Sequence, residues 1–275
     1  MIIQGLWIGN SLTQYEYNSI KSYLNNEFEY HLYTYDKVEN VPNGVIIKNA
    51  NEIIPSCEIF YYEGSIAPFS DLFRYKLLYM KGNVWSDLDI YCVNKFTIDK
   101  DLLFVGERTI KEGAFKSLKP QKPLNSFIYS RHANNEIFKK MYEDCLKFKI
   151  DYLDKKSKIV IRNNTGLTGY HWKGGVKYFG KMLEKYDYLK YVESFEFGFP
   201  VDWWNWKYLF KSIIDDLTIN IGRGWNGSYN FKSILEDSKI IILHNGWIKN
   251  KKIDKNAKPL KDCFIDKLFS KINII

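Results

Sequence analysis

Short apolar segments alternate with amphipathic ones along the first part of the chain. Residues 2–8, 30–35 and 45–48 are rich in aliphatic and aromatic side chains, which is typical of buried strands. Residues 11–26 instead place apolar side chains three or four positions apart, which predicts a helix with Ser11 as its N-cap. The order strand, helix, strand, strand predicts the beginning of a parallel sheet.

The same kind of pattern continues to the end of the chain. It predicts a helix over 67–81 closed by Gly82 and Asn83, a strand over 84–93, an apolar run ending at Glu107, a surface loop over 108–124, a strand over 126–130, a helix over 134–148 and a strand over 240–247. Residues 150–240 are rich in loops and aromatic side chains and contain no repeat. We therefore expect one α/β domain over 1–248, with a mixed, mostly parallel sheet flanked by helices, followed by a separate tail over 249–275.

The charge of the chain is concentrated in this tail. The net charge is +8, and residues 249–275 hold eight lysines against three aspartates. The body is therefore only weakly basic, which argues against a nucleic-acid partner. Apolar residues at Leu260, Cys263, Leu268 and Ile272 follow a helical spacing, so the tail fits a basic helix lying on an anionic membrane surface. It equally fits a helix packed on the body.

Cysteine use and hydropathy indicate the compartment. The four cysteines form neither a CxxC pair nor a closely spaced framework, which favours a reducing environment. No apolar run approaches the roughly 20 residues of a membrane span, and the N-terminus lacks the pattern of a secretion signal. We expect a cytoplasmic protein, with peripheral contact at the inner face of a membrane as an option that the tail offers.

Two aspartates interrupt the apolar segment 84–93. Asp87 and Asp89 are two positions apart, so in an extended strand they face the same side and suit Mg²⁺ or Mn²⁺. Asp71 and Arg74 lie three apart on the preceding helix and share a face, which suits a ligand with phosphates and hydroxyls. Each pattern alone is weak, because Asp71 and Arg74 also fit an ordinary surface ion pair.

Together these residues form a longer motif. The segment SDLFRYKLLYMKGNVWSDLDIYC, residues 70–92, resembles the sugar-binding region with the DXD motif of glycosyltransferase family thirty-two, and more distantly the glucosylating domains of clostridial toxins. The positions that match are Ser70, Asp71, Arg74, Tyr75, Leu78, Gly82, Trp85, Asp87 and Asp89. Asn83 stands where that family has a second glycine, and Asn tolerates the positive φ of such a turn. The opening GLWIG at 5–9 is similar to the family's I-W-x-G opening, and LHNGW at 243–247 is similar to its closing His/Trp element.

The resemblance implies a GT-A fold, a nucleotide-sugar donor such as a UDP-hexose, a divalent cation (Mn²⁺ or Mg²⁺) and transfer with retention of configuration. It implies that Asp89 ligates the metal, and that Asp87 binds the metal through water or the donor ribose. Asp71 and Arg74 would act on the sugar hydroxyls and the phosphates, and Trp7 would stack on the base. Trp7 also fits a core aromatic residue of the first strand.

Five further residues have weaker assignments. His244 is a candidate metal or phosphate ligand or a core histidine, and Trp247 a candidate lid over the diphosphate. Glu107 is a candidate beside the donor sugar or the acceptor hydroxyl, or else a solvated acid at a loop edge. Asn125 and Thr165 are candidates for the acceptor side.

These features favour a glycosyltransferase that acts on a glycan or a lipid-linked glycan, in the synthesis of capsule, lipopolysaccharide or another surface glycan. The same catalytic centre would serve a toxin-like transferase that glycosylates a protein. A non-catalytic relative that only binds sugar nucleotides is a third hypothesis, against which the intact motif argues.

Overall fold

The computed structural model describes residues 1–107, 122–159, 174–201, 206, 209–210 and 231–273. The central sheet consists of the strands β1 (Ile2–Trp7), β2 (Glu29–Thr34), β3 (Ile46–Asn49), β4 (Asn83–Ser86), β6 (Leu102–Glu107) and β7 (Lys122–Ser130). Their order is β3–β2–β1–β4–β7–β6, and β7 runs antiparallel to both of its neighbours, while β3, β2, β1 and β4 are parallel. A second, two-stranded sheet pairs β5 (Ile90–Cys92) with β8 (Ile240–Ile242).

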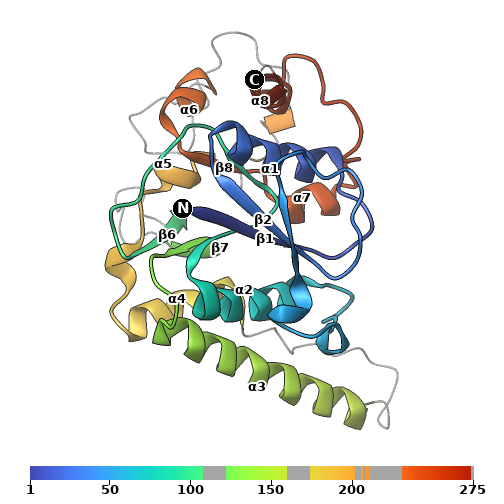
Figure 1. Ribbon diagram of the computed structural model, residues 1–275, viewed down its shortest axis with the longest axis vertical. Helices are drawn as coiled ribbons and strands as arrows, with labels where there is room; N and C mark the ends of the chain where they lie inside the picture. Colours follow the sequence, from blue (N-terminus) through green and yellow to red (C-terminus); the bar gives the residue numbers. More distant parts are fainter. Residues whose placement is uncertain (108–121, 160–173, 202–205, 207–208, 211–230, 274–275) are drawn as a thin grey trace, which may run out of the picture.

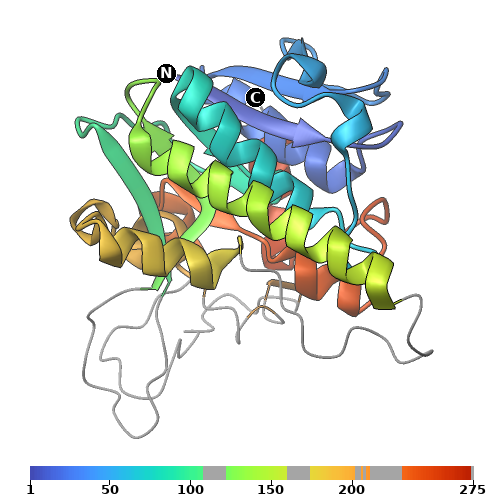
Figure 2. The same cartoon turned by 90° about the horizontal axis from the view of Figure 1, so that it is seen from below.

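Helices cover both faces of this sheet (Figures 1 and 2). The α-helices are α1 (Gln14–Asn25), α2 (Ala67–Lys81), α3 (Glu136–Ile159), α4 (Val176–Lys185), α5 (Phe195–Gly198), α6 (Phe231–Asp237), α7 (Asn245–Asn250) and α8 (Phe264–Asn273), and the 3₁₀ turns are η1 (Ala50–Glu52), η2 (Ser56–Glu58) and η3 (Leu189–Tyr191). Helices α2, α3 and α4 lie on one face, and α1 and the small sheet lie on the other. The predicted fold class, a mostly parallel sheet flanked by helices, is confirmed.

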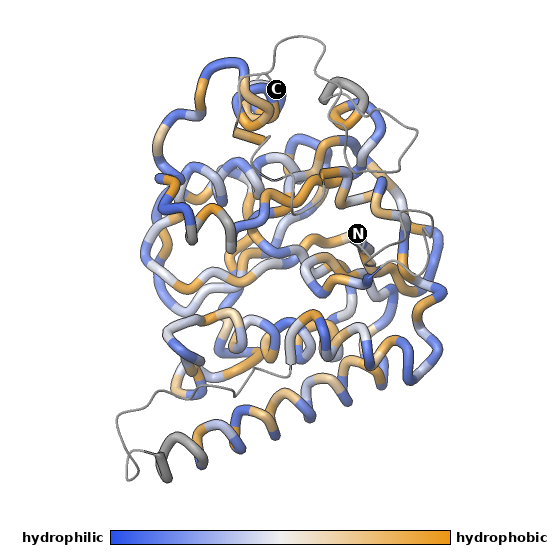
Figure 3. Tube along the Cα trace, turned by 180° about the vertical axis from the view of Figure 1, so that it is seen from behind, coloured by the Kyte–Doolittle hydropathy of each residue, from blue (hydrophilic) through white to orange (hydrophobic). Residues whose placement is uncertain are grey.

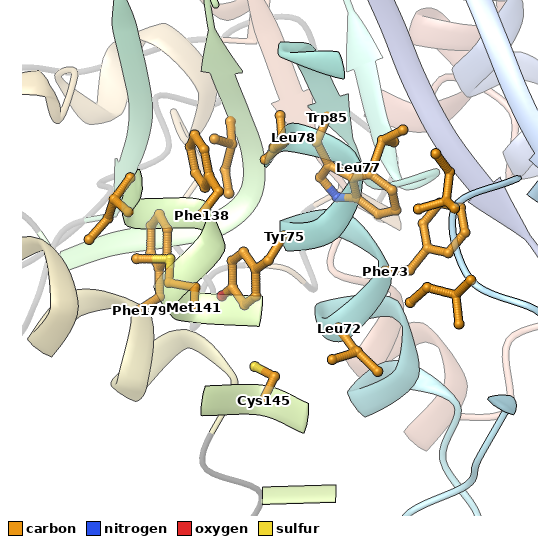
Figure 4. Close-up of a cluster of buried hydrophobic side chains, with 14 of the residues drawn as sticks. Leu72, Phe73, Tyr75, Leu77, Leu78, Trp85, Phe138, Met141, Cys145 and Phe179 are labelled. Atoms are coloured by element: carbon orange, nitrogen blue, oxygen red, sulfur yellow. The ribbon is translucent and has the colours of Figure 1, made fainter. Parts of the chain in front are cut away.

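The two faces of the sheet bury different sets of side chains, because successive residues of a strand point to opposite sides. In β4, Val84 packs with α1 and Trp85 packs with α2 and α3. Figure 4 shows the cluster around Trp85, in which Tyr75 points toward Phe179. The centroids of these two stacked rings lie 6.3 Å apart. Hydrophobic residues follow the central strands, and α3 alternates hydrophobic and hydrophilic positions (Figure 3). Helix α2 is thus fixed by its apolar face, which determines where its polar residues point.

Five predicted boundaries were wrong. The helix expected over 134–148 is α3, which begins at Glu136 and continues to Ile159. The first helix begins at Gln14, with Thr13 at its N-cap position. Ser11, the predicted N-cap, instead forms an isolated parallel β-bridge with Glu39. The expected strand over 84–93 is two strands in different sheets, separated by a turn that contains both aspartates. The expected strand over 240–247 is the short β8 followed by α7. The start of β7 takes the last three residues of the expected loop over 108–124, and the rest of that loop lies outside the described residues.

The C-terminal helix packs on the body. The apolar face of α8 is buried, and the ring of Phe269 lies 5.1 Å from that of Tyr15 and 5.8 Å from that of Tyr91. Lys255 forms an ion pair with the buried Glu16 of α1. The apolar face that the sequence offered to a membrane is therefore occupied by the protein's own core. Within the described ranges, no helix is both long and apolar enough to cross a membrane. The division of the chain at residue 248 stays a prediction.

The turn between α2 and β4 depends on Gly82. Its φ of 61° and ψ of −144° belong to a region that is essentially restricted to glycine. Asn83 follows with φ 64°, so the prediction that Asn keeps this turn in place of a second glycine is confirmed. A side chain at Gly82 would also place its Cβ 2.8 Å from the backbone carbon of His132.

We therefore expect Gly82→Ala to lower the free energy of unfolding by about 3 kcal/mol, measured by denaturant titration. Gly64 provides the matched control, because its φ of 75° is also positive but a Cβ there meets nothing within 4 Å. Gly64→Ala should cost about 1 kcal/mol. Equal effects of the two substitutions would contradict the close approach at Gly82.

Candidate functional site

Polar side chains gather at one edge of the central sheet. Strands β4 and β6 end at this edge, and the antiparallel β7 begins there, because its register pairs Glu107 with Lys122 and Ser86 with Phe127. In open α/β sheets, ligands collect at the carboxyl ends of the parallel strands. The topology therefore brings together chain segments that are far apart in sequence.

The turn between β4 and β5 carries the two aspartates of the motif. Asp87 leaves the strand with its N–H donated to the Ser126 carbonyl at 2.9 Å, and the Asp87 carbonyl accepts from Ile90 N at 3.1 Å. Trp85 Nε1 donates to Asp87 Oδ1 at 2.8 Å. The backbone and an indole thus hold Asp87, so its carboxylate has one defined orientation at the end of the sheet.

Arg74 links the helix residues of the motif to this turn. Its Nη2 lies 2.9 Å from Asp87 Oδ1, and its Nη1 lies 3.6 Å from Asp71 Oδ1 and donates to the carbonyl of Asn125. The guanidinium also lies over the Trp85 ring, 5.0 Å from its centroid. Arg74 is only 4% exposed, so its charge acts on Asp71 and Asp87 from behind the site. The predicted pairing of Asp71 with Arg74 is thus part of a buried network and not a surface ion pair.

Asn125 completes the network from β7. Its Nδ2 donates to Asp71 Oδ1 at 2.8 Å and to the Tyr75 hydroxyl at 3.2 Å. The sequence suggested Asn125 for an acceptor side. The structure places it directly against Asp71, where it fixes the carboxylate that Arg74 also faces.

Asp89 is held by the segment that follows β8. Its Oδ2 accepts the N–H of Asn245 at 2.8 Å, and its carbonyl accepts the N–H of Leu243 at 2.9 Å. Burial, and next the charge of Asp87, raise the pKa of Asp89 to about 6, against the bond from Asn245. Burial also raises the pKa of Asp87, although Arg74 and Trp85 oppose the shift. The positive charge near these two carboxylates does not balance their negative charge, and a bound cation would supply the difference.

A cavity of about 410 Å³ opens at these residues. Its lining consists of Asp87, Asp89, Glu107, Lys122, Leu124, Asn125, Ser126, Val176, Phe199, Ile242, His244, Asn245 and Gly246. Five residues predicted from the sequence therefore line one cavity: Asp87, Asp89, Glu107, Asn125 and His244. The lining combines charged with apolar side chains, a combination that suits a ligand with a polar and a flat apolar part.

His244 lies at the rim in a constrained backbone. Its φ is 58°, its ring packs edge-on against Phe199 with centroids 4.7 Å apart, and its Nε2 lies 3.4 Å from the carbonyl of Val201. Burial lowers the pKa of His244 to about 4, so the imidazole is neutral at neutral pH. A neutral imidazole can serve as a ligand or a hydrogen-bond donor, but it adds no positive charge.

The donor set fits a divalent cation that shares its ligands with a substrate. Within the described residues, no three His, Cys, Asp or Glu side chains gather into a metal cluster. The predicted ligands Asp87, Asp89 and His244 thus line one cavity without forming a three-residue site. Mg²⁺ and similar ions are commonly held by one or two carboxylates plus phosphates and water. Asp87 and Asp89 offer such a pair.

Asp71 and Arg74 lie in the network behind Asp87 and do not line the cavity, and three other predicted residues are not among its described lining either. Trp7, at the end of β1, packs partly buried beside the α1 face of the sheet and does not line the cavity. The side chain of Trp247, in α7, and all of Thr165 lie outside the described residues. Their roles stay predictions.

Comparison with known proteins assigns a family. Residues 4–161, which are more than half of the chain, match the model of a family described as capsular polysaccharide synthesis protein. The chain belongs to this capsular polysaccharide synthesis family. The matched region includes the Asp71–Arg74 network, Asp89 and Lys122, and it ends before His244. A family of polysaccharide synthesis agrees with the resemblance to glycosyltransferases that the motif indicates.

Solved structures similar to this family member are remote in sequence. PaToxG glycosyltransferase shares 15% identity over 67% of this chain and 69% of its own, with a TM-score of 0.44. An active-site mutant of LgtC shares 9% identity over 99% of this chain and 95% of its own, with a TM-score of 0.42. The bifunctional glycosyltransferase WbbM shares 11% identity over 99% of this chain and 51% of its own, with a TM-score of 0.44. No curated protein matches the chain. At these TM-scores the structures carry no argument about what the family member binds.

Sequence reasoning missed two residues of the site. Trp85 was recognised only as a motif position, and its bond to Asp87 follows from the alternation of β4, which places both on the same side. Lys122 lay in the expected loop over 108–124, so nothing indicated that it faces Glu107. Its sequence neighbourhood, rich in Lys and Gly, conceals the start of the strand.

Proposed function

We propose that this capsular polysaccharide synthesis family member is a metal-dependent glycosyltransferase that transfers a hexose from a nucleotide sugar, UDP-linked, to a growing glycan with retention of configuration. The observation that supports it best is the placement of Asp87 and Asp89 in one cavity at the carboxyl end of the sheet. The buried network behind Asp87 adds to this, because buried charges are retained where a function requires them.

The carboxylates of Asp87 and Asp89 would hold the cation, and Asp87 is the one fixed by Arg74 and Trp85. When bound, Mn²⁺ or Mg²⁺ supplies positive charge to the diphosphate that departs from the sugar. Arg74 opposes the rise that burial causes in the pKa of Asp87, and it orients that carboxylate, so we assign Arg74 a positioning role in place of direct contact with the donor phosphates. Asp71 is fixed by Asn125 and does not line the cavity, so its action on the sugar hydroxyls stays a proposal.

The apolar lining residues Leu124, Phe199 and Ile242 would receive the flat part of the donor. Glu107, which also lines the cavity, stays our candidate beside the donor sugar or the acceptor hydroxyl. The neutral His244 would contact the cation or a phosphate through the nitrogen that does not face Val201. Retention would follow if the acceptor hydroxyl attacks from the face that the diphosphate leaves, without a protein nucleophile.

Isothermal titration tests the proposal. UDP-glucose, UDP-galactose, the two UDP-N-acetylhexosamines and GDP-mannose are each titrated into the protein with and without Mn²⁺. We expect one donor to bind in a manganese-dependent way, and incubation of that donor with a glycan acceptor to release nucleoside diphosphate. Binding of a donor with equal affinity in the presence of a chelator would contradict the metal-dependent site.

A further inference from the structure

Glu107 and Lys122 form a charged pair on the wall of the cavity. They are direct partners in the register of β6 and β7, and Lys122 Nζ contacts Glu107 Oε1. Their exposures differ: the Glu107 side chain is 7% exposed and that of Lys122 is 42% exposed. The carboxylate is therefore enclosed, while the ammonium reaches the solvent side of the same wall.

An irregularity in the strand pair sets this position. The register shifts between Phe104 and Gly106, so β6 bends just before Glu107. Such bulges redirect side chains and are frequent beside active sites. Lys122 and Leu124 lie two apart on β7 and both line the cavity, as expected for residues on the same face of a strand. Pairing of the two strands thus places Lys122 on the cavity wall, where its ammonium contacts Glu107.

The charges of the wall make this ammonium unusual. Of the cavity-lining residues that the structure describes, Asp87, Asp89 and Glu107 carry carboxylates and Lys122 carries the positive charge. Arg74 is buried behind Asp87 and does not line the cavity. An anionic ligand that enters among three carboxylates needs positive charge on both of its sides. A cation held by Asp87 and Asp89 would supply positive charge on one side of the ligand. Lys122 would supply it from another part of the lining.

We infer that Lys122 binds the phosphate groups of the ligand and that Glu107 positions the Lys122 ammonium for this contact. The inference rests on the proposed function, since it names a further contact of the same cavity. An ammonium has three N–H donors, so Lys122 can keep its bond to Glu107 and still donate to a phosphate oxygen. Glu107 then acts through Lys122, and the enclosed carboxylate has no need to touch the sugar.

The test compares Lys122→Met, which keeps the length of the side chain without its charge, with Lys122→Arg, which keeps a positive charge. Lys100→Met is the matched control, because Lys100 forms a similar exposed pair with Glu193 and does not line the cavity. The probes, each with Mn²⁺, are UDP, GDP, inorganic pyrophosphate and the nucleosides uridine and guanosine. Thermal unfolding of each variant is recorded alongside.

We expect Lys122→Met to weaken the binding of pyrophosphate and of the preferred nucleoside diphosphate about tenfold, and to leave nucleoside binding unchanged. Lys122→Arg should stay within about threefold of the wild type, and Lys100→Met should equal it. Glu107→Gln should reduce diphosphate affinity less than Lys122→Met does, because it removes only the partner that orients the ammonium.

The outcomes separate this inference from the proposed function. If the wild type binds a nucleoside diphosphate and Lys122→Met binds it equally well, the inference is overturned and the proposed function stands. If Lys122→Met weakens binding while Asp89→Asn does not, the lysine contact is supported and the metal site is contradicted. If the wild type binds neither the nucleotides nor pyrophosphate, both are overturned.

Discussion

Replacing Asp89 by Asn should reduce the transfer of sugar from the preferred donor at least about 100-fold and leave the fold intact. The carboxylate of Asp89 lines the cavity, where it would bind the cation that neutralises the departing diphosphate. An amide has the same shape, and its oxygen can still accept the N–H of Asn245, so the turn keeps its bond. Activity is measured as manganese-dependent release of nucleoside diphosphate, and folding by thermal unfolding.

Asp187→Asn is the control for this substitution. Asp187 is 88% exposed in an ion pair with Lys190 and has a positive φ, which Asn also tolerates. It should retain wild-type activity. If Asp89→Asn retained more than about a third of the wild-type rate in saturating Mn²⁺, a role of Asp89 at the metal would be contradicted.

Arg74→Met should lower the free energy of unfolding by about 3 to 5 kcal/mol and abolish donor binding. The substitution leaves the buried Asp71 and the partly buried Asp87 without the guanidinium that faces both of them. It also removes the donor to the Asn125 carbonyl, which is buried beside them. Denaturant titration measures the stability, and calorimetry measures the binding of the donor. Arg74→Lys keeps the positive charge but not the fork geometry of the guanidinium. Its stability and its donor binding should therefore lie between those of the wild type and those of Arg74→Met.

Arg131→Met shows what loss of an exposed guanidinium does. Nε of Arg131 lies 2.9 Å from Oδ1 of Asp101, and the side chains of Arg131 and Asp101 are 41% and 71% exposed. Its replacement should change stability by less than about 1 kcal/mol. A similar small effect for Arg74→Met would mean that the buried network contributes little to the fold, and it would remove the basis for a positioning role.

The sequence predicted those elements whose periodicity is strong. The apolar run that became β1, the helical spacing of α2 and the glycine that ends α2 each follow from local chemistry, and the structure has them in place. The turn between β4 and β5 was not predicted, because the apolar residues on both sides of Asp87 and Asp89 continue the strand pattern. Only pairing decides that the two halves enter different sheets, and pairing is a long-range property.

The candidate site shows the same division. The motif residues Asp71, Arg74 and Asp87 could be grouped from the sequence, because their spacing on a helix and at a strand end is local. That Asn125 donates to Asp71, and that Lys122 opposes Glu107, depends on how β7 pairs with its neighbours. The amphipathic tail was correctly identified as a helix, but its spacing alone could not decide whether its apolar face meets a membrane or, as found, Tyr15 and Tyr91.

One crystallographic measurement addresses the proposed site most directly. Crystals are grown with MnCl₂ and UDP, and an anomalous difference map locates the manganese. The proposed function predicts a peak at bonding distance, about 2 Å, from a carboxylate oxygen of Asp89 or Asp87, with the diphosphate in the same cavity. A manganese peak away from both carboxylates, or a nucleotide bound outside this cavity, would contradict it.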